Sequence, residues 1–207
     1  MQLYGRSSSH FTRIARIFAA EAELDLDFQL IRDLMSADPA GYGDNPALKL
    51  PTLKSDDGTW FGSLGICREL VRNSELNLDV VWPEDAATAR VANAQEMVTQ
   101  AMSTEVALVM GKAAGVPADN AQQAKLRTSL LGTMQWLEDN AAAAIAALPV
   151  DRDLSYLEVS LFCLIEHLPW REVLAMDDYP NLRAFAERFG KRSSAKATPF
   201  KFDFPPS

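Results

Sequence analysis

A run of three serines precedes the first predicted helix. Ser7, Ser8 and Ser9 stand just before Phe11, where apolar residues begin to recur at helical spacing. Hydroxyls at such a position commonly accept hydrogen bonds from the unpaired amides of the first helical turn. A hydroxyl at the positive end of a helix dipole can also donate to a thiolate and lower the pKa of that thiol. The run therefore allows two interpretations, a helix cap or a thiol-activating group.

A second stretch, residues 45–70, reads as two strands followed by a helix. The apolar, β-permissive residues 50–54 lead into an Asp-Asp-Gly-Thr turn at 56–59, and Trp60 opens the returning strand. An Asp-Gly turn between such segments predicts a β-hairpin. Apolar residues then recur at helical spacing from Ile66, so the hairpin runs directly into a short amphipathic helix.

Two residues of this stretch bear on binding. Pro51 opens an apolar strand and lacks an amide donor, which places it at a sheet edge or beside a ligand. A cis bond before Pro51 would turn the backbone so that it can pair with a bound peptide, although position and bond statistics alone favour the trans form. Ser63 stands where the N-cap of the following helix is expected.

The composition excludes several functional classes. The 207 residues carry a net charge of −8, which argues against nucleic acid as a partner. No apolar run approaches the roughly eighteen residues of a membrane span, and no signal peptide is evident, so we expect a cytoplasmic protein without a membrane partner. Cys67 and Cys163 lie in separate apolar patterns, as buried free thiols do. His10 and His167 form no Cys/His cluster, so no metal site is expected.

These motifs resemble the core signature of the cytosolic glutathione S-transferases, in particular bacterial members of the serine type. The matching residues are Asn45-Pro46, Lys49-Leu50-Pro51-Thr52-Leu53, Asp57-Gly58 and Ser63-Leu64-Gly65-Ile66. Residues 179–192, which begin Tyr-Pro-Asn-Leu, look like the penultimate helix of that family. The resemblance is diffuse between these two stretches but covers nearly the whole chain.

The resemblance implies a fold of α/β plus all-α class. The order β-α-β, loop, β-β-α fits a thioredoxin-like glutathione-binding domain over residues 1–74, and residues 73–83 read as a linker. An all-helical domain that forms the electrophile site is expected over residues 84–207. Its periodic segments 86–114 and 118–148 predict an antiparallel helix pair, and Ser155 with Glu158 forms a capping box at a buried helix. An irregular segment follows from Ala197.

In the family, the proline is cis and the residue before it pairs through its backbone with the cysteinyl part of glutathione, while a helix-capping serine holds the γ-glutamyl carboxylate. Leu50, Pro51 and Ser63 match these positions. Lys49 is either a solvated lysine or a counter-charge for the glycine carboxylate. Gly62 stands where the family commonly has an acidic or amide residue, so one side-chain bond to glutathione is missing.

The catalytic hydroxyl has two possible registers. Ser9 is nearest the expected helix start and matches the family's catalytic position, whereas counting from the Ser-Ser run of zeta-like members selects Ser8. Tyr4 is a third hydroxyl, but it lies in a predicted strand. His10 stands where the family often has proline.

The implied activity is detoxification by a homodimeric transferase, with attack of the glutathione thiolate on a small-molecule electrophile and with residues between Met97 and Met110 lining the electrophile site. Two alternatives remain: a glutathione-dependent isomerase or dehalogenase, and a non-catalytic binding or regulatory protein of the same fold. A serine hydrolase is disfavoured, because the sequence has no Gly-x-Ser-x-Gly elbow.

Overall fold

The structure is a computed structural model and describes residues 1–204. The chain divides into two compact units, which are described separately. The first contains residues 1–78 together with the segment from Lys191 onward, and the second contains residues 79–190. The segment from Lys191 onward was predicted to belong to the helical domain, but its residues cluster with the first unit.

The first unit is built on a mixed sheet in the order β2-β1-β3-β4. Its strands are β1 (Gln2–Gly5), β2 (Asp27–Leu30), β3 (Thr52–Ser55) and β4 (Gly58–Phe61). Strand β1 is parallel to β2 and antiparallel to β3, and β3 and β4 form the predicted hairpin. This is the expected thioredoxin-like arrangement.

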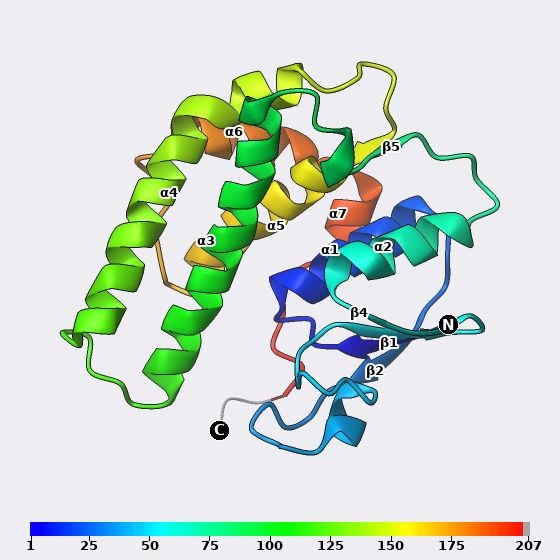
Figure 1. Cartoon of the computed structure of the whole chain (residues 1–207), viewed down its shortest axis with the longest axis horizontal. Coiled ribbons are helices and arrows are strands. Elements are labelled where there is room, and N and C mark those ends of the chain that lie inside the picture. The colour runs from blue at the N-terminus through cyan, green and yellow to red at the C-terminus, as the bar shows by residue number, and fades with distance from the viewer. Residues whose placement is uncertain (205–207) are drawn as a thin grey trace. The chain divides into compact units, whose positions relative to one another are not determined.

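Two helices, α1 (His10–Glu21) and α2 (Ser63–Arg72), pack together on one face of this sheet, and the short 3-10 helix η1 (Pro39–Tyr42) lies on the other (Figure 1). Apolar side chains from both layers are fully buried at this interface: Leu3, Ile14, Phe18, Leu53 and Ile66. Each contributes on the order of 1.5–3 kcal/mol relative to an exposed position, so this layer is what holds α1 and α2 on the sheet.

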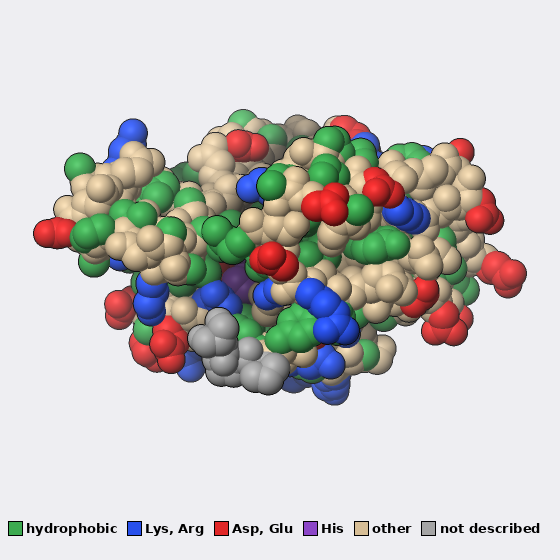
Figure 2. Space-filling view, turned by 90° about the horizontal axis from the view of Figure 1, so that it is seen from below, with side chains coloured by type: hydrophobic (Ala, Val, Ile, Leu, Met, Phe, Trp, Pro, Cys, Tyr) green, Lys and Arg blue, Asp and Glu red, His purple; other side chains and the backbone are tan. Residues whose placement is uncertain are grey.

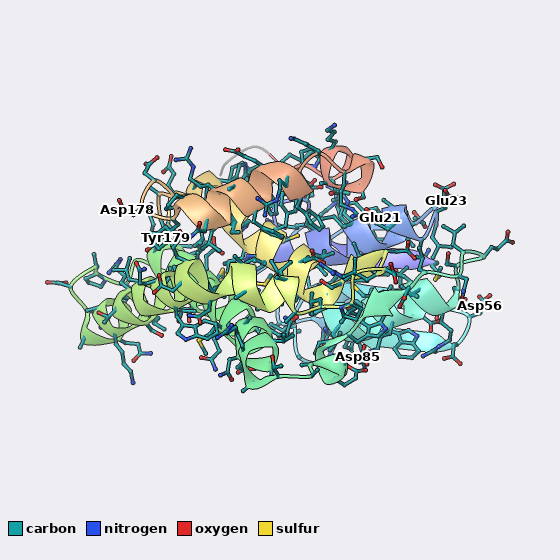
Figure 3. The ribbon with its side chains drawn as sticks, turned by 90° about the horizontal axis from the view of Figure 1, so that it is seen from above. Glu21, Glu23, Asp56, Asp85, Asp178 and Tyr179 are labelled. Carbon is teal, nitrogen blue, oxygen red and sulfur yellow. The ribbon has the colours of Figure 1, made fainter. Side chains whose placement is uncertain are left out.

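A third helix of this unit, α7 (Ser193–Ala197), is tied to the end of α1. The Glu21 carboxylate accepts hydrogen bonds from the guanidinium of Arg192, at 2.8 and 3.0 Å, and from the hydroxyl of Ser194. Figure 3 labels Glu21 at this place in α1. Residues 198–204 after α7 are irregular, as expected, whereas residues 205–207 of the predicted irregular segment lie outside the described residues.

The second unit consists mainly of four helices, α3 (Ala89–Ala113), α4 (Ala121–Ala146), α5 (Tyr156–Trp170) and α6 (Pro180–Phe189). Helices α3 and α4 form the predicted antiparallel pair (Figure 1). Helix α5 is the most apolar of the four, and its residues Leu161, Cys163 and Leu164 are fully buried. Glu138 of α4 caps α6, because its carboxylate accepts from the amides of Asn181 and Leu182 at 2.8 and 3.0 Å.

Several local features differ from the sequence expectations. Within and just after the predicted linker, the structure has the two-residue strand β5 (Val80–Val81) and the 3-10 helix η2 (Pro83–Asp85). Strand β5 pairs in parallel with β6 (Leu154–Ser155), the two residues before α5. Ser155 caps α5 as predicted, since its hydroxyl oxygen accepts from the Glu158 amide at 3.1 Å. The Glu158 carboxylate, however, accepts from the Ser155 hydroxyl and from Arg152.

Both cysteines, Cys67 and Cys163, are buried free thiols, as expected. None of the helices within residues 1–204 combines the length and hydropathy needed to cross a membrane. On the face seen in Figure 2, acidic and basic side chains are interspersed with hydrophobic ones. The predicted fold class, an α/β layer plus an all-helical part, is confirmed.

Candidate functional site

The strand register brings three separate segments of the chain to the same end of strands β1, β3 and β4. Thr52, the first residue of β3, is paired with Tyr4 near the end of β1 and with Phe61 at the end of β4. Three segments therefore meet at this end of the sheet: the loop after β1, the residues before β3 and the residues after β4. These segments contain all the predicted site residues of the first unit.

The serine loop begins at a close approach between β1 and α1. A Cβ atom added to Gly5 would lie 2.5 Å from the side chain of Thr12, so a side chain at position 5 would push α1 away from the strand. Ser9 is the N-cap of α1, and its Oγ accepts from the Thr12 amide at 3.2 Å. A hydroxyl has one donor hydrogen besides its two acceptor sites, so this cap leaves Ser9 able to donate. Ser9 is half-buried.

The other two hydroxyl candidates, Ser8 and Tyr4, lie farther from the start of α1 than Ser9 does. Ser8 is half-buried in the turn that precedes Ser9. His10, the first residue of α1, is buried. The Tyr4 hydroxyl donates to the side chain of Gln2 at 3.3 Å, toward the end of β1 that is opposite to the serine loop. This geometry favours Ser9 over Tyr4 as the group nearest the start of α1.

The second segment contains the cis peptide bond between Leu50 and Pro51, as the sequence resemblance implied. Asn45 braces the turn before it: its Nδ2 donates to the Lys49 carbonyl and its Oδ1 accepts from the Ala47 amide, both at 2.9 Å. Pro51 is buried, and the backbone of Leu50 forms no hydrogen bond with another residue among 1–204. The backbone of Leu50 is thus available to pair with an extended ligand. The Lys49 residue is exposed.

The third segment is the start of α2, and here the predicted cap is wrong by one residue. Gly62 is the N-cap and Ser63 is the first helical residue, 7% exposed. Gly62 has φ 76° and ψ 142°, a conformation that residues with a Cβ rarely adopt. No side chain caps this end. The ten-residue helix α2 therefore presents its positive end and first-turn amides to any carboxylate held there.

A buried carboxylate that the sequence analysis missed fixes α2 to the hairpin. Glu69 is 1% exposed, and it accepts from the Ser55 hydroxyl and from the Arg72 guanidinium, each at 2.8 Å. Trp60 extends this network through its indole N–H to the Ser55 oxygen at 3.3 Å. Glu69 follows Ser63 by less than two turns, so this network sets the position of the helix start.

The second unit contains a buried polar pair that the sequence analysis also missed. His167 Nδ1 on α5 lies 2.7 Å from Glu105 Oε1 on α3, and the two residues are 5% and 0% exposed. Burial lowers the pKa of the nearby Arg171, and the charge of Glu105 partly opposes this effect. The pairing joins residues 62 positions apart, so periodicity within either helix gives no signal for it.

The sequence matches no protein-family model and no curated protein. Among solved structures, a glutathione S-transferase from Methylobacillus flagellatus KT with bound glutathione is 25% identical, covers 96% of this chain and 98% of its own length, and has a TM-score of 0.75. This chain has the glutathione S-transferase fold.

Two further structures extend the comparison. A glutathione transferase family member from Pseudomonas fluorescens Pf-5, with bound glutathione, is 21% identical at a TM-score of 0.77, and the match covers 100% of this chain and 99% of that one. Gtt2 from Saccharomyces cerevisiae is 16% identical at a TM-score of 0.67, with 96% and 100% covered. Because one fold supports many reactions, the activity of this glutathione S-transferase-like chain has to be inferred from its site.

Proposed function

We propose that the protein is a glutathione transferase-like enzyme that activates the thiol of glutathione for attack on an electrophilic small molecule. The observation that carries the proposal is the convergence, at the same end of strands β1, β3 and β4, of the Ser9 hydroxyl, the open backbone of Leu50 and the uncapped start of α2. The solved structures with bound glutathione support the choice of this co-substrate.

Each segment has a separate task in this proposal. The backbone of Leu50 pairs with the cysteinyl part of glutathione, and the start of α2 at Ser63 receives the γ-glutamyl carboxylate. The Ser9 hydroxyl donates to the sulfur and favours the thiolate over the thiol. The thiol proton leaves to solvent. The sulfur then forms its bond to the electrophilic carbon, and the electron pair of the broken bond departs with the leaving group or stays on an activated acceptor.

We propose that the helical second unit forms the site for the electrophile, a small molecule, as the family resemblance implies. Of the methionines predicted to line that site, Met102 is 1% exposed and fills the core of the second unit, whereas Met110 is 37% exposed on α3. Met110 is therefore able to contact a ligand, and Met102 is not.

A second candidate function is favoured by Gly62. Because glycine supplies no side chain at the start of α2, one contact to glutathione is absent, and a glutathione-binding protein with little turnover fits this loss. Isomerisation or dehalogenation with glutathione would start from the same thiolate and would differ in the electrophile and in the steps that follow its attack.

We also propose that the protein is a symmetric homodimer, the commonest closed oligomer. Light scattering at micromolar concentration should then give twice the mass of one chain.

Thermal unfolding tests the proposal. Glutathione at ten times its Kd should stabilise the protein by about 1.4 kcal/mol, because only the folded chain binds it. The cysteinylglycine dipeptide, which lacks the whole γ-glutamyl residue and with it that carboxylate, is the control and should stabilise the protein much less. Equal melting temperatures with and without saturating glutathione would overturn the proposal. Stabilisation without conjugation across a broad panel of electrophiles would select the binding protein.

A further inference from the structure

Residues 198–204, here called the strap, return from α7 to the serine loop within the first unit. Asp203 Oδ2 accepts a hydrogen bond from the Ser7 amide at 2.7 Å, although 196 positions separate the two residues. Two aromatic rings of the strap contact arginines of the serine loop and of α1. The Arg13 guanidinium lies 4.3 Å from the centre of the Phe200 ring, and the Arg6 guanidinium lies 5.4 Å from that of Phe204. In Figure 1 the strap is the red trace beside the blue turn between β1 and α1.

Both polar groups of the peptide that joins Arg6 to Ser7 are hydrogen-bonded: its N–H, that of Ser7, donates to Asp203. The carbonyl of the same peptide, that of Arg6, accepts from the Ser9 amide at 3.1 Å, which closes residues 6–9 into a turn. A peptide unit is planar, so rotation about it would break the bonds to Asp203 and to Ser9 together. Asp203 thus acts on Ser9 through one rigid group.

The side chain of Ser7 does not replace the contact that Asp203 makes with the Ser7 amide. The Ser7 Oγ is buried and forms no hydrogen bond within the part of the chain that the structure describes, so the side chain of Ser7 does not orient the turn. Arg6 fixes the flank of the loop instead, by donating from Nε to the Ile31 carbonyl at 2.7 Å. The Asp203 carboxylate also lies near Arg16: burial lowers the pKa of the Arg16 guanidinium, and the charge of Asp203 partly opposes this effect.

We infer that Asp203 is a positioning residue for thiol activation: it holds the peptide plane between Arg6 and Ser7, and thereby the direction in which Ser9 presents its hydroxyl. This inference rests on the proposed function and assigns a role to the strap. Because a displacement of about 1 Å at a catalytic group can cost a large factor in rate, the contact should affect turnover more than glutathione affinity.

Three variants of the whole chain test the inference. Asp203→Ala removes the acceptor and should lower kcat by about tenfold, while the KM for glutathione stays within about twofold because Leu50 and Ser63 are unaffected. Asp203→Asn keeps an acceptor oxygen and should recover kcat to within about threefold of wild type. Lys201→Gln alters an exposed residue of the same strap and should match wild type. Asp203→Ala should also shift the acid limb of the kcat–pH profile to higher pH.

The outcomes separate this inference from the proposed function. If wild type shows no glutathione turnover, both fall. If wild type is active and Asp203→Ala equals it, only the role of Asp203 is overturned. Higher activity in Asp203→Ala, or equal losses in Asp203→Asn and Asp203→Ala, would likewise overturn it. A loss restricted to melting temperature, with kcat per folded molecule and the pH profile unchanged, would show a purely structural contact and would also contradict the inference.

Discussion

Tyr4 and Thr52 face each other across β1 and β3, and this pairing places the serine loop beside the cis proline. Gly43 packs against both residues. It has φ +68°, and a Cβ added there would lie 2.8 Å from the Tyr4 ring and 3.3 Å from Thr52 Cγ2. The space between η1 and the sheet edge therefore admits only glycine at this position.

Gly43→Ala should accordingly destabilise the protein by about 2–4 kcal/mol, from left-handed backbone strain plus overpacking. Gly41→Ala, inside η1 and two residues before its C-cap Gly43, is the control, since a Cβ at Gly41 meets nothing within 4 Å. We expect that control to stay within about 0.5 kcal/mol of wild type. Denaturant unfolding measures both, and equal stability of the two variants would refute the packing described for Gly43.

Ser9→Ala separates the cap from the catalytic hydroxyl. Loss of the cap to Thr12 should cost about 1 kcal/mol of stability, and loss of the donor should lower turnover of a generic electrophile by roughly 10- to 1000-fold. Thr88→Ala is the control for capping alone, because Thr88 caps α3 through its Oγ1 to the Val91 amide at 3.3 Å. It should cost similar stability and leave turnover per folded molecule intact.

Ser8→Ala completes that set and should reduce turnover much less than Ser9→Ala. A larger loss in Ser8→Ala would move the catalytic position by one residue while keeping the mechanism. If Ser9→Ala and Thr88→Ala lose equal stability and neither loses turnover, Ser9 is only a cap.

The contact of Glu21 with α7 should weaken in acid. Burial alone would raise the pKa of the Glu21 carboxyl, but hydrogen bonds from Arg192 and Ser194 outweigh burial and hold the pKa below its ordinary value of 4.5. A carboxyl whose pKa is lower in the folded state stabilises it fully above the unfolded-state pKa and loses that effect as pH falls through the folded-state value.

The stability difference between wild type and Glu21→Gln should therefore be largest near neutral pH and shrink steadily below about pH 4.5. Glu75→Gln, at an exposed position of the same unit, provides the control and should show a much smaller pH dependence. Unfolding midpoints measured from pH 3 to 7 decide the matter. A Glu21→Gln difference that grows in acid would have the wrong sign for this account.

The sequence predicted local structure well because hairpin, helix and cap signals depend on neighbouring residues. The Asp-Gly turn, the helix starts at Ser9 and Ser155 and the paired long helices were readable for this reason. The N-cap of α2 was predicted at Ser63 but is Gly62. Gly62 has a positive φ and open space around its Cα, and a helix-capping pattern in the sequence does not indicate such a backbone conformation.

Contacts between distant residues could not be predicted from one sequence. The bond between Asp203 and Ser7, the network around Glu69 and the pairing of β5 with β6 each depend on how separated segments meet in space. The cis bond before Pro51 followed from the family resemblance, since bond statistics alone pointed to trans.

The most direct test of the central claim is the ionisation of glutathione while it is bound. Thiolate absorbance of the complex, titrated against pH, should give a thiol pKa below the value of about 8.5 for a free cysteine thiol, because Ser9 and the start of α1 favour the anion. In the Ser9→Ala complex the pKa should return toward the free value, while glutathione still binds. An unshifted pKa in the wild-type complex, or the same lowered pKa in both proteins, would contradict thiol activation by Ser9.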